Sequence, residues 1–123
     1  MIRNFLLIGI GGAAGSMARY AITLLLPKTA VTSFPVSTLL VNLLGSLLIG
    51  LLAGVALRSQ WMTQTGTALL AAGLCGGFTT FSAFALDGIR LLEAGAVLTA
   101  LLYVSLSVVV GMVLCYAGYH LVS

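Results

Sequence analysis

The chain has 123 residues, of which 61% are hydrophobic and 6% are charged, and its formal net charge is +3. A soluble domain carries charges at about a quarter of its positions, so this composition excludes a water-soluble core covered by polar surface. The lipid bilayer is the solvent that fits, and we expect one small all-α membrane domain over residues 1–123.

Charge-free stretches divide the chain into four predicted membrane helices. A membrane-spanning helix needs roughly 20 mainly apolar residues. Residues 31–57, 59–86 and 94–119 contain no charge, and residues 4–26 contain only Arg19. Proline, glycine and charged residues separate these stretches. The predicted helices cover residues 3–26, 36–57, 66–94 and 96–121.

The first predicted span allows two interpretations. Its basic start, apolar run and small residues resemble a secretory signal. Removal of such a signal would leave three spans and no soluble body to export, so a retained helix is favoured. The glycines of this span, and those of residues 36–57, are spaced in a way that lets helix backbones approach closely.

Positive charges are divided almost evenly between the two sides of the predicted bundle. Four spans put both termini on one side, together with Arg3 and Arg58, while Lys28 and Arg90 lie on the other side with Arg19 within reach. Orientation follows the excess of Lys and Arg in short loops. The near absence of an excess allows insertion in both orientations and hence an antiparallel dimer. A weak bias that still fixes one orientation is the alternative.

The second predicted span contains one strongly polar residue, Asn42, near its middle. A side-chain amide in the bilayer core must find hydrogen-bond partners, because an unsatisfied polar group is costly there. One interpretation is a structural bond between helices. The other is a hydrogen-bond donor that faces a water-filled path and binds an anion. The residue by itself favours the structural interpretation.

The third predicted span contains the sequence GLCGGFTTFSAF, from Gly73 to Phe84. Its three glycines each weaken a helix by about 1 kcal/mol relative to Ala, and its paired threonines add the reluctance of β-branched residues. We therefore predict a break near residues 76–80 that leaves two half-helices. Irregular backbone at membrane depth is tolerated only where it is buried in protein or lines a cavity, and its carbonyls are good cation ligands. Two such breaks at a dimer axis would enclose one small cation.

Two phenylalanines, Phe81 and Phe84, follow the predicted break and share a helix face. Core packing or lipid contact is the usual interpretation of such a pair. A second interpretation uses the electropositive edge of an aromatic ring, which attracts anions without a tight hydrogen bond. Ion conduction needs weak binding at several sites, so the second interpretation is compatible with a pore.

In the fourth predicted span, Tyr103 and Ser107 are four residues apart and lie on one helix face, which Gly111 continues. A column of hydroxyls provides a polar track for a desolvated ion, while local bonds to carbonyls are the alternative.

The cysteines, Cys75 and Cys115, lie within spans and are interpreted as small buried residues. Enzymatic chemistry is not expected, because nothing in the sequence pairs an acid or nucleophile with the only histidine.

Three sequence blocks resemble a known family. GGAAGSMARY, STLLVNLLGSLLIG and GLCGGFTTFSAF are similar to the three signature blocks of the Fluc/CrcB fluoride ion channels. The match runs through the first three predicted spans, and the fourth fits in length and polar spacing. The resemblance implies an antiparallel dual-topology homodimer in a microbial plasma membrane, with subunits in both orientations. It implies two pores that passively export fluoride from the cytoplasm.

The resemblance also implies roles for individual residues. Asn42 corresponds to a pore hydrogen-bond donor, and Phe81 and Phe84 correspond to the pore phenylalanines. Tyr103 and Ser107 correspond to the polar track of the fourth helix.

Around the break, the resemblance implies that the backbone carbonyls of Gly76 and Thr79 hold a structural Na⁺ at the dimer interface. Arg19 corresponds to a basic residue near a pore vestibule, with extension of its side chain to the membrane surface as the alternative. Thr80 and Ser82 are possible pore-lining residues.

The chain departs from the family pattern at Gly111, where some members have a serine as the third hydroxyl of the polar track. The resemblance therefore leaves open whether this chain has a shorter hydroxyl column or a water in that place.

Two other functions fit four short spans. A small multidrug-type, proton-coupled cation exporter needs a membrane-embedded carboxylate. The deepest acid here is Asp87, which we interpret as structural or interfacial, with Arg90 three residues away as an ion-pair partner. A non-conducting membrane scaffold would account for the glycines, but not for the break, Asn42 and the two phenylalanines together.

Overall fold

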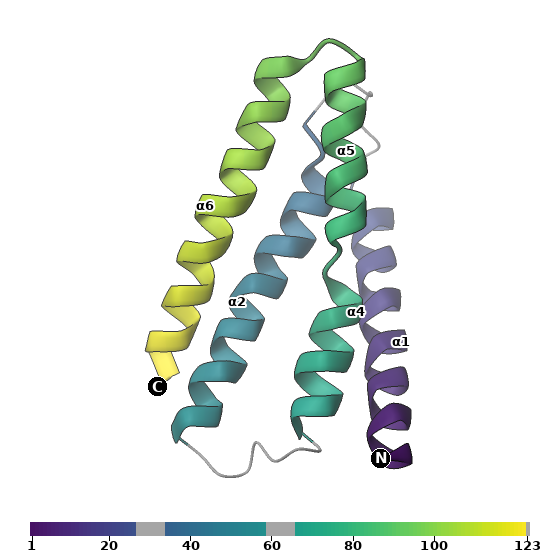
Figure 1. Ribbon diagram of the computed structural model, residues 1–123, viewed down its shortest axis with the longest axis vertical. Coiled ribbons are helices and arrows are strands. Elements are labelled where there is room, and N and C mark those ends of the chain that lie inside the picture. The colour runs from purple at the N-terminus through teal and green to yellow at the C-terminus, as the bar shows by residue number, and fades with distance from the viewer. Residues whose placement is uncertain (27–33, 59–65, 123) are drawn as a thin grey trace.

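The computed structural model describes residues 1–26, 34–58 and 66–122, and within these ranges every regular element is a helix (Figure 1). Four stretches are long and apolar enough to cross a membrane, which confirms the predicted spans to within a few residues. The predicted loop that contains Lys28 lies outside the described residues. The elements are α1 (Ile2–Leu25), α2 (Val36–Arg58), the π-helix η1 (Thr67–Cys75), α4 (Gly76–Phe78), α5 (Phe81–Glu93) and α6 (Val97–Val122).

Both ends of the chain lie at the same end of the bundle, as four spans require (Figure 1). At the opposite end, a tight turn joins α5 to α6. Gly95 in this turn has a φ of +81°, a backbone conformation that glycine adopts without the steric cost of a Cβ.

Glycines bring α1 against the first half of the third span. A Cβ on Gly15 would collide with the backbone at Leu74, and a Cβ on Gly77 would collide with the backbone of Gly12. The helices α1, η1 and α4 therefore approach at backbone distance, as small residues permit in membranes. This confirms the predicted packing role for Gly11 and Gly15, whereas a Cβ on Gly9 would meet nothing within 4 Å.

The second close helix pair is α2 with α6. A Cβ on Gly50 would collide with the backbone of Cys115, and a Cβ on Gly118 would meet the backbone of Leu47 and Leu51. Glycines from both helices therefore contribute to this contact, and the bundle consists of two tightly packed helix pairs.

Large side chains, rather than glycines, hold α5 in place. Leu91, Ala100 and Tyr103 form a buried cluster between α5 and α6, and Phe34 and Phe84 pack against it. Tyr103 is 0% exposed although it carries a hydroxyl group. The third span is therefore packed by glycines on α1 before its break and by large side chains on α6 after it.

The predicted break is confirmed, and within the predicted range it lies at the paired threonines rather than at the glycines. Thr79 and Thr80 have extended backbone, with φ/ψ of −84°/158° and −150°/117°. Gly76 and Gly77 remain helical within α4. The glycine at 77 is needed for the close approach of α1, so its lack of a Cβ serves packing and the threonines carry the break. The π-helical winding of η1 before the break was not predicted.

Candidate functional site

Asn42 forms two hydrogen bonds with the backbone of the broken segment. Its Nδ2 donates to the Thr80 carbonyl at 3.0 Å, and its Oδ1 accepts from the Thr80 N–H at 2.9 Å. The bond to Oδ1 satisfies the Thr80 N–H, which the interrupted helix cannot satisfy within itself. Asn42 thus joins α2 to the break, as the structural interpretation predicts, and one N–H of its amide is not used in these bonds.

Two backbone carbonyls lose their regular helical donors at the break. In a continuous α-helix the Thr80 N–H would bond to Gly76 O, and the Ala83 N–H would bond to Thr79 O. The first donor is bonded to Asn42 Oδ1, and the second to Thr80 Oγ1 at 3.1 Å, where Thr80 caps α5. Gly76 and Thr79 are the two residues that the family resemblance implies as cation ligands. Carbonyls at the carboxyl end of a half-helix and in unwound backbone are suited to Na⁺.

The neighbouring Gly77 carbonyl has other partners. It accepts from Ser16 Oγ at 3.4 Å and from Arg19 Nε at 3.4 Å, both from α1. A cation at the carboxyl end of a helix interacts favourably with its dipole, so the half-buried Arg19 stabilises the end of α4. Arg19 also lines a polar cavity of about 100 Å³ with Ser37 and Thr80. Its side chain is thus turned to the break.

A groove of about 420 Å³ lies between α2 and the broken span. It brings together residues that are far apart in sequence, including five of the predicted site residues. Those five are Asn42, Gly76, Thr79, Thr80 and Phe81. Gly45 and Ser46 of α2 line the same groove. Phe81 is 78% exposed in the single chain, so the groove opens on the outside of the bundle.

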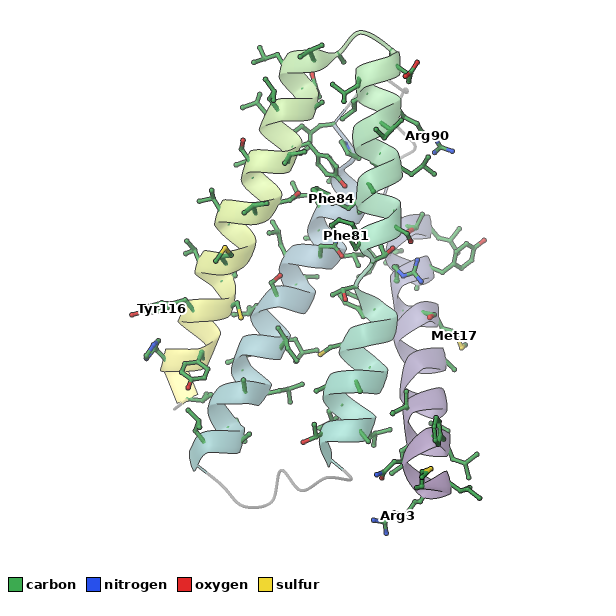
Figure 2. The ribbon with its side chains drawn as sticks, in the orientation of Figure 1. Arg3, Met17, Phe81, Phe84, Arg90 and Tyr116 are labelled. Carbon is green, nitrogen blue, oxygen red and sulfur yellow. The ribbon has the colours of Figure 1, made fainter. Side chains whose placement is uncertain are left out.

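Three aromatic rings extend from this opening to the interior. The ring centroids of Phe81 and Phe84 are 5.7 Å apart, and those of Phe84 and Tyr103 are 5.1 Å apart. Phe81 and Phe84 lie close together directly after the break (Figure 2). Phe84 is half-buried and Tyr103 is fully buried. The three residues therefore form a continuous row across α5 and α6.

The Tyr103 hydroxyl donates to Asp87 Oδ2 at 3.3 Å, which joins α6 to α5. The proposed ion pair between Asp87 and Arg90 is wrong, because the described residues contain no such pair; Arg90 is exposed and points away from the bundle (Figure 2). The reason is geometric: a partner on α6 reaches Asp87 across the helix interface, while Arg90 lies on the outer surface. Asp87 nevertheless has the structural role that the sequence suggested.

The hydroxyl row of α6 faces the interior of the bundle. Ser107 Oγ is buried and has no hydrogen-bond partner within the described residues. Gly111, one turn further along, is buried against α2. Ser82 lies apart from this row, is exposed, and shares a hydrogen bond of 3.3 Å with Thr80 Oγ1.

The sequence interpretation missed Ser16 and Ser46. Ser16 is four residues after Gly12, which packs on Gly77, so its contact with the break follows from helix geometry only once the α1–α4 pair is known. Ser46 is four residues after Asn42, on the same face of α2. That spacing is visible in the sequence and was the available signal.

The chain is similar in sequence to known proteins over nearly its whole length. A protein of Azobacteroides pseudotrichonymphae genomovar. CFP2 is 37% identical over 121 residues, covering 98% of this chain and 97% of the relative. Relatives from Prosthecochloris aestuarii (45% over 113 residues; 92% and 88% covered) and Thermus thermophilus (41% over 120 residues; 98% and 95% covered) are similar. All three relatives are named fluoride-specific ion channel FluC. Residues 6–119 match the family described as CrcB-like protein, Camphor Resistance (CrcB), and the chain belongs to this family.

Proposed function

We propose that this protein is a fluoride channel that lets the anion leave the cytoplasm passively. The names of its full-length relatives support the choice of ion. The observation in the structure that carries the pathway is the row of Phe81, Phe84 and Tyr103, which leads from an open groove to the buried hydroxyl of Ser107. Ring edges and neutral donors attract an anion weakly, as conduction requires.

A second copy of the chain completes the site in this proposal. The groove at the break opens on the outside of one chain, with Phe81 at its edge. Irregular backbone that faced lipid would leave polar groups unsatisfied, so the break needs a protein or water-filled surface in front of it. An antiparallel partner, permitted by the balanced positive charges, would cover this face and give two equivalent pores. Both orientations would then occur in the plasma membrane of a microbe.

The proposal includes a structural Na⁺ between the two copies. The Gly76 and Thr79 carbonyls of each chain would hold it, because their regular helical donors are diverted to side chains. When bound, the ion would supply positive charge that offsets the carbonyl ends of the interrupted helices. Asn42 keeps this segment of backbone in place and has one remaining N–H for an anion.

The proton-coupled cation exporter has less support. Its mechanism needs a carboxylate that is accessible to substrate within the membrane. Asp87 is half-buried and accepts a bond from Tyr103, so it participates in the packing of α5 on α6. No feature of the described residues favours this function over an anion pathway.

The direct test is ion efflux from liposomes that contain the purified protein. We expect rapid fluoride efflux without a proton gradient and far slower chloride efflux. Phe81→Ile and Phe84→Ile should each slow fluoride efflux by about a hundredfold, while Phe5→Ile on the exposed surface of α1 should not. Proton-dependent exchange of organic cations, with no fluoride efflux, would contradict the proposal.

A separate measurement tests the cation. Dimer stability in detergent should be higher in Na⁺ than in an equal concentration of a large organic cation such as N-methyl-D-glucamine. Size-exclusion chromatography after heating gives this readout without any measurement of transport. Equal stability in the two salts would exclude a structural Na⁺ while leaving the fluoride pathway open to its own test.

A further inference from the structure

The hydroxyl row on α6 ends at a residue that has no side chain. Tyr103, Ser107 and Gly111 recur every four residues on the face that packs against the rest of the bundle. Ser107 Oγ is buried and has no partner within the described residues, although a buried hydroxyl is ordinarily hydrogen-bonded. The unsatisfied hydroxyl is a donor that remains unused for a polar ligand, and the next position along the row, Gly111, offers no side chain from α6.

A hydroxyl from α2 lies opposite that gap. A Cβ placed on Gly111 would be 3.4 Å from Ser46 Oγ and 3.9 Å from the Leu43 side chain. Ser46 is half-buried and also lines the groove that contains Asn42. The Ser46 side chain therefore lies between the groove and Gly111, the next position in the α6 row.

We propose that Ser46 supplies the hydroxyl that α6 lacks at Gly111, and that it contacts the permeating anion after Ser107. This inference rests on the proposed fluoride pathway and adds a specific donor to it. The polar row would then consist of two residues from α6 and one from α2, and its length would not be reduced by the glycine.

The present hydrogen bond of Ser46 is one that it can exchange. Ser46 Oγ donates to the Asn42 carbonyl at 2.8 Å. In a regular helix that carbonyl also accepts from the backbone N–H four residues later, which is that of Ser46 itself. Rotation of the hydroxyl towards an anion thus leaves the carbonyl with its helical partner. A neutral hydroxyl also binds without adding a fixed charge that would trap the ion.

The experiment moves the hydroxyl from one helix to the other. In the liposome assay, Ser46→Ala should slow fluoride efflux by about tenfold, the factor expected for one hydrogen bond to a charged ligand. The double variant Ser46→Ala with Gly111→Ser returns a hydroxyl to the same place from α6. Its efflux should recover to within about threefold of the unmodified protein.

The matched control is Ser46→Ala with Gly111→Ala, which adds the same Cβ without a hydroxyl. We expect no recovery in this variant. Recovery equal to that of the serine variant would overturn the proposal, because it would show that packing and not hydrogen bonding limits the rate. Normal efflux from Ser46→Ala would overturn it as well.

Folding is monitored by the elution of each variant in size-exclusion chromatography. If Ser46→Ala does not assemble, Ser46→Thr preserves the hydroxyl, and it should retain efflux within about threefold. A well-assembled threonine variant with tenfold slower efflux would overturn the proposal. Absence of fluoride efflux from the unmodified protein would instead refute the proposed function, so the two failures are distinguishable.

Discussion

The two halves of the third span belong to one continuous sequence but are held by different means. Before the break, η1 and α4 contact α1 backbone to backbone, and Gly77 lies against Gly12. After the break, α5 contacts α6 through large side chains such as Leu91 and Tyr103. Close glycine packing leaves no tolerance for added volume, whereas a contact between side chains can adjust. The difference shows that the third span changes its partner helix at the same point where its backbone conformation changes.

Two glycines in the same span give the strongest test of this comparison. Gly77→Ala places a Cβ against the backbone of Gly12, so we expect a loss of about 3 kcal/mol of stability and failure to assemble. Gly88→Ala, in α5, meets nothing within 4 Å and should be neutral or stabilise by about 1 kcal/mol. Thermal unfolding followed by size-exclusion chromatography measures both. Equal effects of the two substitutions would refute the contrast.

The connection between the two halves depends on Asn42. Asn42→Ala removes both bonds to Thr80 and leaves an N–H and a carbonyl without these partners, at a cost of about 2 kcal/mol. Hydrogen exchange at the Thr80 amide should accelerate strongly, because that N–H has no helical acceptor to return to. Ser105→Ala, on the exposed face of α6, is the control and should leave the exchange rate unchanged. Slow exchange in Asn42→Ala would show that the bond to Oδ1 is dispensable.

Substitutions of the two phenylalanines should differ in their effect on stability but should both slow fluoride efflux. Phe84 contacts Tyr103, so Phe84→Ile should lower stability by about 1 kcal/mol through loss of the aromatic pair. Phe81→Ile also removes a ring contact, that with Phe84, but Phe81 is exposed in the single chain, so monomer stability should change by no more than about 0.5 kcal/mol. Both should slow fluoride efflux as described above. Equal losses of stability would mean that the two rings do not differ in environment.

The smallest expected effect is at the end of α4. Arg19→Gln keeps a hydrogen-bond donor but removes the charge near the Gly77 carbonyl, which should cost about 0.5 kcal/mol. Arg19→Lys keeps the charge and should cost less. Chemical unfolding of the two variants side by side provides the measurement. A larger loss for lysine than for glutamine would indicate that the shape of the guanidinium, rather than its charge, matters.

Composition and periodicity were sufficient for much of the architecture. The absence of charges over long stretches determined four membrane helices, because the bilayer excludes charge and needs helices of about 20 residues. The spacing of Tyr103 and Ser107 placed them on one helix face. The unfavourable helix propensity of residues 76–80 predicted the position of the break. The break is confirmed at Thr79 and Thr80.

Tertiary structure decided which residue serves which purpose. The sequence could not show that Gly77 packs on Gly12, that Asp87 bonds to Tyr103, or that Ser46 lies opposite Gly111, since each contact joins different helices. The local pattern of a helix fixes its faces but not its partners. Partner choice depends on how closely two backbones can approach and on which polar groups must be satisfied once they have, and both are properties of the assembled bundle.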